Sequence, residues 1–143
     1  MHSEHNKTPP CDMGPAPTQF SLPSAAQENR AFRHTLWTGE HLQLTVMYLA
    51  PGEDIGTEMH ANVDQLLRVE EGHALLRYGS CRSAIRDVGY MRRGDVFLVP
   101  AGTYHNLINA GRGPLRLSSV YAPPNHPKGT VHQTKEDALK EEH

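Results

Sequence analysis

The feature that most constrains the fold of this chain is a regular alternation of short apolar runs with turns rich in Gly and Pro. From residue 31 onward the runs are AFRHTLW, HLQLTVMYLA, DQLLRVE, HALLRYG, DVFLVP, HNLINA and LRLSSVYA, and the segments between them include TGE, PGED, EEG, RRGD, PAG and AGRGP. Within HLQLTVMY, apolar residues Leu42, Leu44 and Val46 alternate with polar ones, which is the period of a half-buried strand. Many short strands joined by tight turns predict an all-β fold, a barrel or jelly roll that buries its strand edges.

The chain of 143 residues is long enough for one domain with a proper core. Residues 1–30 are rich in Pro, Ser, Gln and Asn and predict a flexible N-terminal arm. Residues 31–122 form the predicted barrel, in which residues 79–93 fit either a strand or a mobile loop. Residues 123–143 begin as an extended, Pro-rich tail, in which Thr134 and Asp137 favour one short helical turn.

Charge and composition limit the partners and the location of the protein. The net charge is −2 and the basic residues are scattered, so we expect neither nucleic acid nor an anionic membrane surface as a partner. The start of the chain is polar and no stretch reaches about 18 apolar residues, which argues against a signal peptide or membrane span and for a cytoplasmic protein. Cys11 and Cys81 are interpreted as free thiols.

Two stretches carry candidate metal ligands. In PGEDIGTEMHANVDQLLRVEEG, Glu58 and His60 are two residues apart, so on a strand both side chains project from the same face and can reach one ion. The polar connection ANVD has hairpin length and brings Gln65 onto the returning strand, roughly opposite His60. In GDVFLVPAGTYHNLIN, a tight Pro-Ala-Gly turn precedes His105, the second imidazole, at the start of another strand.

These two stretches resemble the two signature motifs of the cupin superfamily, G-x5-H-x-H-x3-4-E-x6-G and G-x5-P-x-G-x2-H-x3-N. The resemblance spans roughly residues 34–122 and implies a double-stranded β-helix, a jelly-roll barrel. The chain also looks like a group of small bacterial single-domain cupins that are sometimes called mannose-6-phosphate-isomerase-like. The second motif is matched at every fixed position, by Gly94, Pro100, Gly102, His105 and Asn109. The first motif is matched by Gly52, His60 and Gly72, and it differs at two positions, with Glu58 in place of its first His and Gln65 in place of its Glu.

The resemblance implies one divalent first-row ion, Fe, Mn, Ni or Zn, in the barrel. Cupins usually bind it with three His and one Glu, a set whose charge is −1. Here the implied set is Glu58, His60, Gln65 and His105, so the carboxylate has moved while the charge of the set is kept. Gln65 serves either as a direct ligand or as a hydrogen-bond partner. Without it, two His and one carboxylate remain, as in non-haem iron centres.

A pocket for a small molecule is expected beside the ion, lined by Leu67 and Leu107, with Met47 and Tyr104 as further candidates. His126 and His132 lie in the Pro-rich tail, which we expect to be solvated, and they are left out of the site; the alternative is a tail that folds over the mouth of the barrel. The expected function is a metal-dependent enzyme, of isomerase or dioxygenase type, acting on a sugar, an oxo acid or an enol. The alternative is a non-catalytic module that binds or senses a small molecule.

We also expect a homodimer, because a small jelly roll has open edge strands that cupins commonly cover by pairing barrels. The segment AFRHTLW is the predicted contact, since Phe32, Leu36 and Trp37 are large apolar groups that follow the arm. In the alternative, these three residues close the barrel of their own chain.

Overall fold

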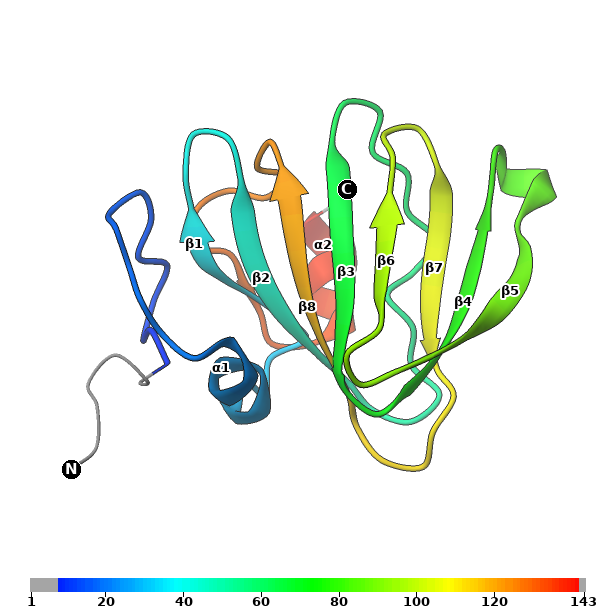
Figure 1. Cartoon of the computed structure of the whole chain (residues 1–143), viewed down its shortest axis with the longest axis horizontal. Coiled ribbons are helices and arrows are strands. Elements are labelled where there is room, and N and C mark those ends of the chain that lie inside the picture. The colour runs from blue at the N-terminus through cyan, green and yellow to red at the C-terminus, as the bar shows by residue number, and fades with distance from the viewer. Residues whose placement is uncertain (1–7, 142–143) are drawn as a thin grey trace.

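The computed structural model describes residues 8–141 and consists of two antiparallel sheets (Figure 1). The larger sheet has six strands in the order β6-β3-β8-β2-β1-β9, and the smaller has three in the order β5-β4-β7. The prediction of an all-β fold is confirmed. The strands are β1 (Arg33–Thr38), β2 (Gln43–Leu49), β3 (Asp64–Glu71), β4 (His73–Gly79), β5 (Arg86–Arg92), β6 (Val96–Val99), β7 (Tyr104–Asn109), β8 (Leu115–Ala122) and β9 (Val131–His132).

The connections follow from the turn residues of the sequence. Gly72, between β3 and β4, has a φ of 99°, and a Cβ there would lie 2.6 Å from the carbonyl oxygen of Pro114, so only glycine fits. In the segment that fitted a strand or a loop, a single 3-10 turn, η2 (Arg82–Ala84), precedes strand β5. Strand and turn therefore both occur in residues 79–93.

The register of the large sheet decides which residues face the barrel interior. Across β2, β8 and β3, Gln43 lies opposite Tyr121, which in turn lies opposite Gln65. Two residues along, the corresponding row is Thr45, Ser119 and Leu67, and the next is Met47, Leu117 and Val69, all of them buried. The interior is therefore polar at one end and apolar at the other.

Strand β2 is buried on both faces rather than on one. Its polar residues Gln43 and Thr45 face the interior, while Val46 packs with Leu36, Ala25 and Ala26 in a second apolar cluster. The alternation in the sequence predicts one buried and one exposed face. The difference arises because a helix covers the apolar side of this strand.

That helix is α1 (Leu22–Glu28), inside the segment expected to be a flexible arm. The Ser21 side chain caps it by accepting a hydrogen bond from the Ser24 amide, and Pro23 lies in the first turn. The buried side of α1 consists of two alanines, which give too weak an apolar period to reveal a helix in the sequence. The arm prediction is therefore wrong for these residues, while residues 1–7 lie outside the described part of the chain.

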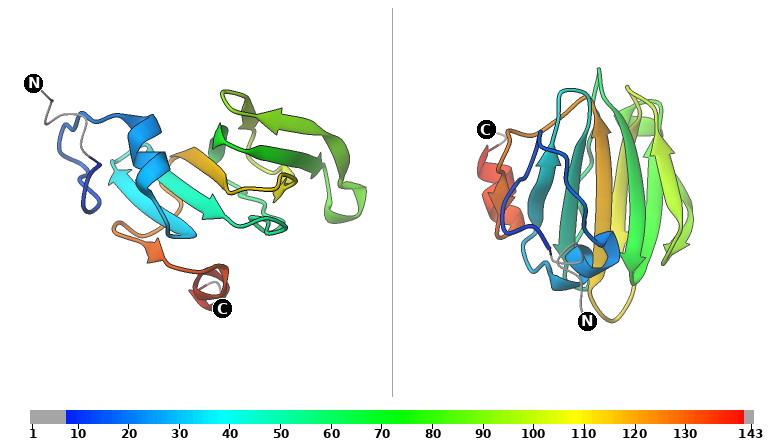
Figure 2. Two further views of the ribbon diagram at one scale, coloured as in Figure 1. Left: turned by 90° about the horizontal axis from the view of Figure 1, so that it is seen from below. Right: turned by 60° about the vertical axis from the view of Figure 1, so that its left-hand side comes forward.

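The C-terminal tail forms α2 (Lys135–Glu141), somewhat longer than the single turn that was expected. The predicted cap is present: the Asp137 amide donates to Thr134 Oγ1, and the Thr134 amide donates to an Asp137 carboxylate oxygen. Helices α1 and α2 lie on opposite sides of β1 and β2 (Figure 2). Ala138 of α2 joins the main core, so the tail closes one side of the barrel.

Two further expectations concern surfaces. Of the three large apolar residues of AFRHTLW, Phe32 is buried in the main core, Leu36 packs with helix α1 and Trp37 is half-buried, and the homodimer stays a prediction. Cys11 and Cys81 are exposed free thiols, as predicted. Among residues 8–141, no helix is long and apolar enough to cross a membrane.

Candidate metal centre

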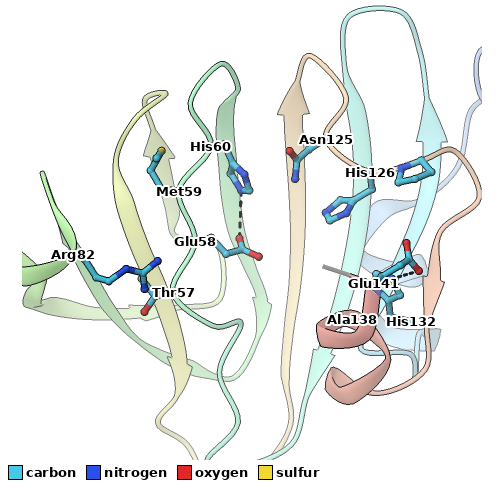
Figure 3. Close-up of a pocket in the computed structure, with 11 residues that line it drawn as sticks. Thr57, Glu58, Met59, His60, Arg82, Asn125, His126, His132, Ala138 and Glu141 are labelled. Carbon is cyan, nitrogen blue, oxygen red and sulfur yellow. Dashed lines mark hydrogen bonds and ion pairs between the residues drawn. The ribbon is translucent and has the colours of Figure 1, made fainter. Parts of the chain in front are cut away.

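Three of the four predicted ligands converge at one point of the barrel. The donor atoms of Glu58, His60 and His105 all lie within 4.8 Å of one another. Glu58 Oε1 is 3.5 Å from His60 Nε2 and 3.8 Å from His105 Nε2. The backbone explains this convergence, because Glu58 and His105 exchange a reciprocal pair of amide-to-carbonyl hydrogen bonds, each 2.9 Å long. Figure 3 shows the carboxylate of Glu58 directed at the ring of His60.

The unpaired polar atoms of this cluster fit a cation. His60 Nε2, His105 Nε2 and Gln65 Oε1 are buried and have no hydrogen-bond partner within the described chain. His105 Nδ1 lies 3.1 Å from the carbonyl oxygen of Thr103, an arrangement in which Nδ1–H donates and the lone pair of Nε2 faces the cluster. Buried acceptors without a donor destabilise a fold, and a bound metal ion would satisfy them.

Gln65 is oriented as a ligating amide would be. Its Nε2 donates to Ser119 Oγ at 2.8 Å, so its Oε1 is the atom left free in the interior. Ser119 lies on β8, one of the two neighbours of β3 in the sheet, and thereby fixes which end of the amide faces inward. Direct ligation by Gln65 stays a prediction.

Arg33, which neither motif contains, is the partner of the candidate carboxylate ligand. Its buried guanidinium donates from Nη2 to Glu58 Oε2 at 3.3 Å, while Glu58 Oε1 faces the two imidazoles. Burial acts to raise the pKa of Glu58, but the neighbouring His60 and the charge of Arg33 outweigh it and hold the pKa below its usual value. Glu58 is therefore anionic. The signal in the sequence was a charged residue inside the apolar run AFRHTLW.

A cavity of about 510 Å³ opens beside the cluster, on the side of the C-terminal tail. None of the four predicted lining residues borders it. Met47, Leu67 and Leu107 are buried in the main core, because the face they share with the ligands continues toward the apolar end of the barrel. Tyr104 lies beneath the guanidinium of Arg82, at 5.4 Å. The residues that do line the cavity are Thr57, Glu58, Met59, His60, Arg82, Asn125, His126, Pro127, His132, Ala138 and Glu141.

The expectation of a solvated tail is wrong for His126 and His132, and the alternative, a tail folded over the mouth of the barrel, is the arrangement observed. Both line the cavity, facing Glu58 and His60 from the opposite side (Figure 3). Gln43 holds this part of the tail in place, since its Oε1 accepts from the amides of Asn125 and His126 and its Nε2 donates to the His126 carbonyl. No local pattern in the sequence indicates this contact, because Gln43 lies on β2, far from the tail along the chain.

The two tail histidines have defined partners. His132 accepts a hydrogen bond from Arg33 at Nδ1 (3.3 Å) and donates from Nε2 to Glu141 (2.9 Å). The His126 ring packs edge-on against Tyr121, with Nε2 3.4 Å from the phenol oxygen. Burial, together with the charge of Arg33, lowers the pKa of His126 to about 3, so its ring is neutral at pH 7.

The chain belongs to the cupin family: residues 45–121 match the family described as cupin domain. It is 48% identical over 131 residues to the uncharacterized protein YrkC of Bacillus subtilis (strain 168), an alignment that covers 92% of this chain and 70% of that protein. The crystal structure of BH2720 from Bacillus halodurans superposes with a TM-score of 0.89 at 47% identity, covering 91% of this chain and 98% of the other.

A more distant structure bears on the fold alone. A conserved protein with a double-stranded β-helix domain from Klebsiella pneumoniae gives a TM-score of 0.56 at 20% identity, covering 75% of this chain and 88% of that one. The prediction of a double-stranded β-helix is thus confirmed. Membership of the mannose-6-phosphate-isomerase-like group stays a prediction.

Proposed function

We propose that this cupin binds one divalent first-row metal ion through Glu58, His60 and His105, with Gln65 as a fourth ligand. The observation that carries the proposal is the pair of buried imidazole Nε2 atoms that have no hydrogen-bond partner among residues 8–141 and that both face one anionic carboxylate oxygen. Fe, Mn, Ni and Zn all accept such a set of nitrogen and oxygen donors. When bound, the ion acts as a Lewis acid on an oxygen atom of a small molecule.

The adjacent cavity supports binding of a small polar metabolite, such as a sugar, an oxo acid or an enol. Its size suits a small ligand, and Thr57, Asn125 and His126 offer hydrogen-bonding groups on its walls. Helix α2 and the tail border the cavity on one side. A metal-dependent enzyme of isomerase or dioxygenase type is the function that this arrangement supports best.

One observation favours the alternative, a non-catalytic module that binds or senses a small molecule. A general base is most effective when its pKa lies near the working pH. His126, with a pKa of about 3, is too weak a base for that role, although its neutral ring can still donate or accept a hydrogen bond. Turnover assays of the metal-loaded protein against sugars, oxo acids and enols separate the two functions.

The metal proposal is tested by elemental analysis of protein purified without an affinity tag or chelator. We expect about one metal ion per chain in the wild type, and loss of it in both His60→Ala and His105→Ala, because each removes an imidazole donor. His41→Ala is the matched control, since this imidazole is exposed and remote from the cluster. Full occupancy in both ligand variants would show that the ion binds elsewhere.

We also propose that the protein is a cytoplasmic homodimer. Phe32 and Leu36 are buried in their own chain, whereas Trp37 is half-buried and is the large apolar group of AFRHTLW that remains available for the contact. Light scattering at tens of micromolar tests the dimer, and a monomer at that concentration would refute it.

A further inference from the structure

A continuous series of hydrogen bonds links the proposed metal ligand Glu58 to helix α2. Arg33 donates from Nη2 to Glu58 Oε2 and from Nη1 to His132 Nδ1, both at 3.3 Å. A guanidinium can only donate, so His132 carries its proton on Nε2, which lies 2.9 Å from the carboxylate of Glu141 and donates to it. We call Glu58, Arg33, His132 and Glu141 the relay. Arg33 and His132 are buried and Glu141 is the last residue of α2, so the relay runs from the metal centre through the interior to the helix.

Helix α2 is attached to the barrel by few contacts. Of its seven residues only Ala138 is buried, and a cavity of about 230 Å³ lies between the helix and the barrel. An ion pair holds each end of the helix: Lys135 pairs with Asp54 at the start, and Glu141 pairs with His132 at the end. A helix of this length is not stable by itself in water, so it depends on these contacts. We therefore expect α2 to open locally at a free-energy cost well below that of global unfolding.

The charges of the relay make this docking sensitive to the ion. In the structure the carboxylate of Glu58 neutralises the buried guanidinium of Arg33. An ion bound to Glu58 would share that carboxylate, so the positive charge of Arg33 would be only partly compensated. Among residues 8–141, Glu141 is the other carboxylate that lines the cavity, and His132 joins it to Arg33. Helix α2 also carries three acidic residues against two lysines, so added positive charge at the centre attracts it.

We propose that a divalent ion at the centre strengthens the docking of α2 through the relay, and that loss of the ion releases the helix. The inference rests on the proposed metal centre and adds a regulatory movement to it. His132 is a positioning residue that transmits the effect from Arg33 to Glu141. Because Glu58 and Ala138 border both the cavity of about 510 Å³ and the one of about 230 Å³, release of α2 would join the two cavities beside the centre.

The size of the effect is limited by the exposure of the last residue of the relay. Glu141 is 58% exposed, so water and salt screen its charge, and we expect the ion to strengthen docking by about threefold. Coupling between two binding events is reciprocal, so the docked helix raises the affinity for the ion by the same factor.

The test measures the docking of α2 rather than turnover. Amide hydrogen exchange of the full chain is followed by mass spectrometry of peptic peptides, with metal-free protein compared with protein saturated with Zn²⁺. Calorimetry establishes separately that Zn²⁺ binds. When reclosing is fast, the exchange rate follows the population of the open helix, so the α2 amides should exchange about threefold more slowly with Zn²⁺. The amides of α1, on the opposite side of β1 and β2, should be unchanged (Figure 2).

Variants of exposed residues of α2 assign the effect to the relay. Glu141→Gln should abolish the difference between the two exchange rates, because the end of the relay loses its charge. Glu136→Gln is the matched control: it removes an exposed carboxylate from the same helix, outside the relay, and should keep the difference. Lys135→Gln removes the pair with Asp54, so α2 should exchange faster in both states while the ratio between them is kept. A purely structural role of Glu141 would give the result expected for Lys135→Gln.

The outcomes separate this inference from the function on which it rests. If calorimetry shows that the wild type binds no Zn²⁺, the metal proposal fails and the coupling fails with it. If Zn²⁺ binds but the α2 amides exchange at the same rate, the metal proposal stands and the coupling is overturned. If Zn²⁺ slows exchange but Glu141→Gln keeps the whole difference, or Glu136→Gln loses it, the effect does not pass through the relay and the inference is wrong.

Discussion

Replacing Glu58 with Gln removes the only anion among the proposed ligands while keeping the size and shape of the side chain. The donor atoms of the cluster lie within 4.8 Å of one another, so an ion among them is no farther than this from the carboxylate. At an effective dielectric constant near 20, the attraction between a double and a single charge at that distance is about 7 kcal/mol. The amide oxygen remains a donor and Arg33 already opposes the ion, so we expect a net loss of about 3 kcal/mol, or roughly a hundredfold in affinity.

The same substitution also acts on the metal-free protein, because it leaves the guanidinium of Arg33 buried without its anion. Removing one partner of a buried ion pair costs about 3–5 kcal/mol of stability. Urea unfolding and circular dichroism therefore accompany the titrations, so that affinity is measured on folded protein.

The assay for Glu58→Gln is titration of Co²⁺ or Zn²⁺ into metal-free protein by calorimetry. Glu141→Gln is the matched control, since this carboxylate lines the same cavity but is largely exposed and interacts with His132. The control should bind metal within about threefold of the wild type, because an exposed charge is well screened. Equal affinities of the wild type and Glu58→Gln would show that Glu58 does not ligate an ion, and the assignment of the centre would be wrong.

Three further predictions concern stability. Because the pKa of His126 is lowered to about 3, the folded protein binds a proton at this ring less readily than the unfolded chain, so its stability should fall as the pH drops from about 6.5 toward 3. In urea unfolding, the stability lost between pH 7 and 4.5 should be about 2 kcal/mol smaller for His126→Gln than for the wild type. An equal loss in the two proteins would contradict the burial of the ring. Asp12→Asn should lower the free energy of unfolding by about 2 kcal/mol, because the carboxylate accepts hydrogen bonds from Thr38 Oγ1 and from the amides of Gly14 and Gly129. An unchanged urea midpoint would show that these hydrogen bonds contribute nothing to stability. Deletion of residues 1–30 should lower the free energy of unfolding by about 3 kcal/mol or more, because loss of α1 exposes Leu36 and Val46. Thermal unfolding of the shortened chain measures the loss, and an unchanged midpoint would refute the prediction.

Much of the fold follows from local sequence signals. The strands are visible because apolar residues alternate over short runs, and the turns are visible because backbone conformations such as that of Gly72 require glycine. The cap formed by Thr134 and Asp137 is equally local. The three converging candidate ligands Glu58, His60 and His105 could also be named from the sequence, because their spacings resemble the two cupin motifs.

The contacts between distant segments were decided by the tertiary structure alone. Arg33 lies 25 residues before Glu58, and Gln43 lies 83 residues before His126, yet these contacts set the charge at the candidate metal centre and hold the tail against the cavity. Helix α1 likewise becomes visible only where it covers the apolar side of β2. Local patterns specify conformation because they depend on the backbone and its near neighbours. The polarity of a barrel interior and the net charge of a site depend instead on which strands pair and in which register, and no local pattern encodes that.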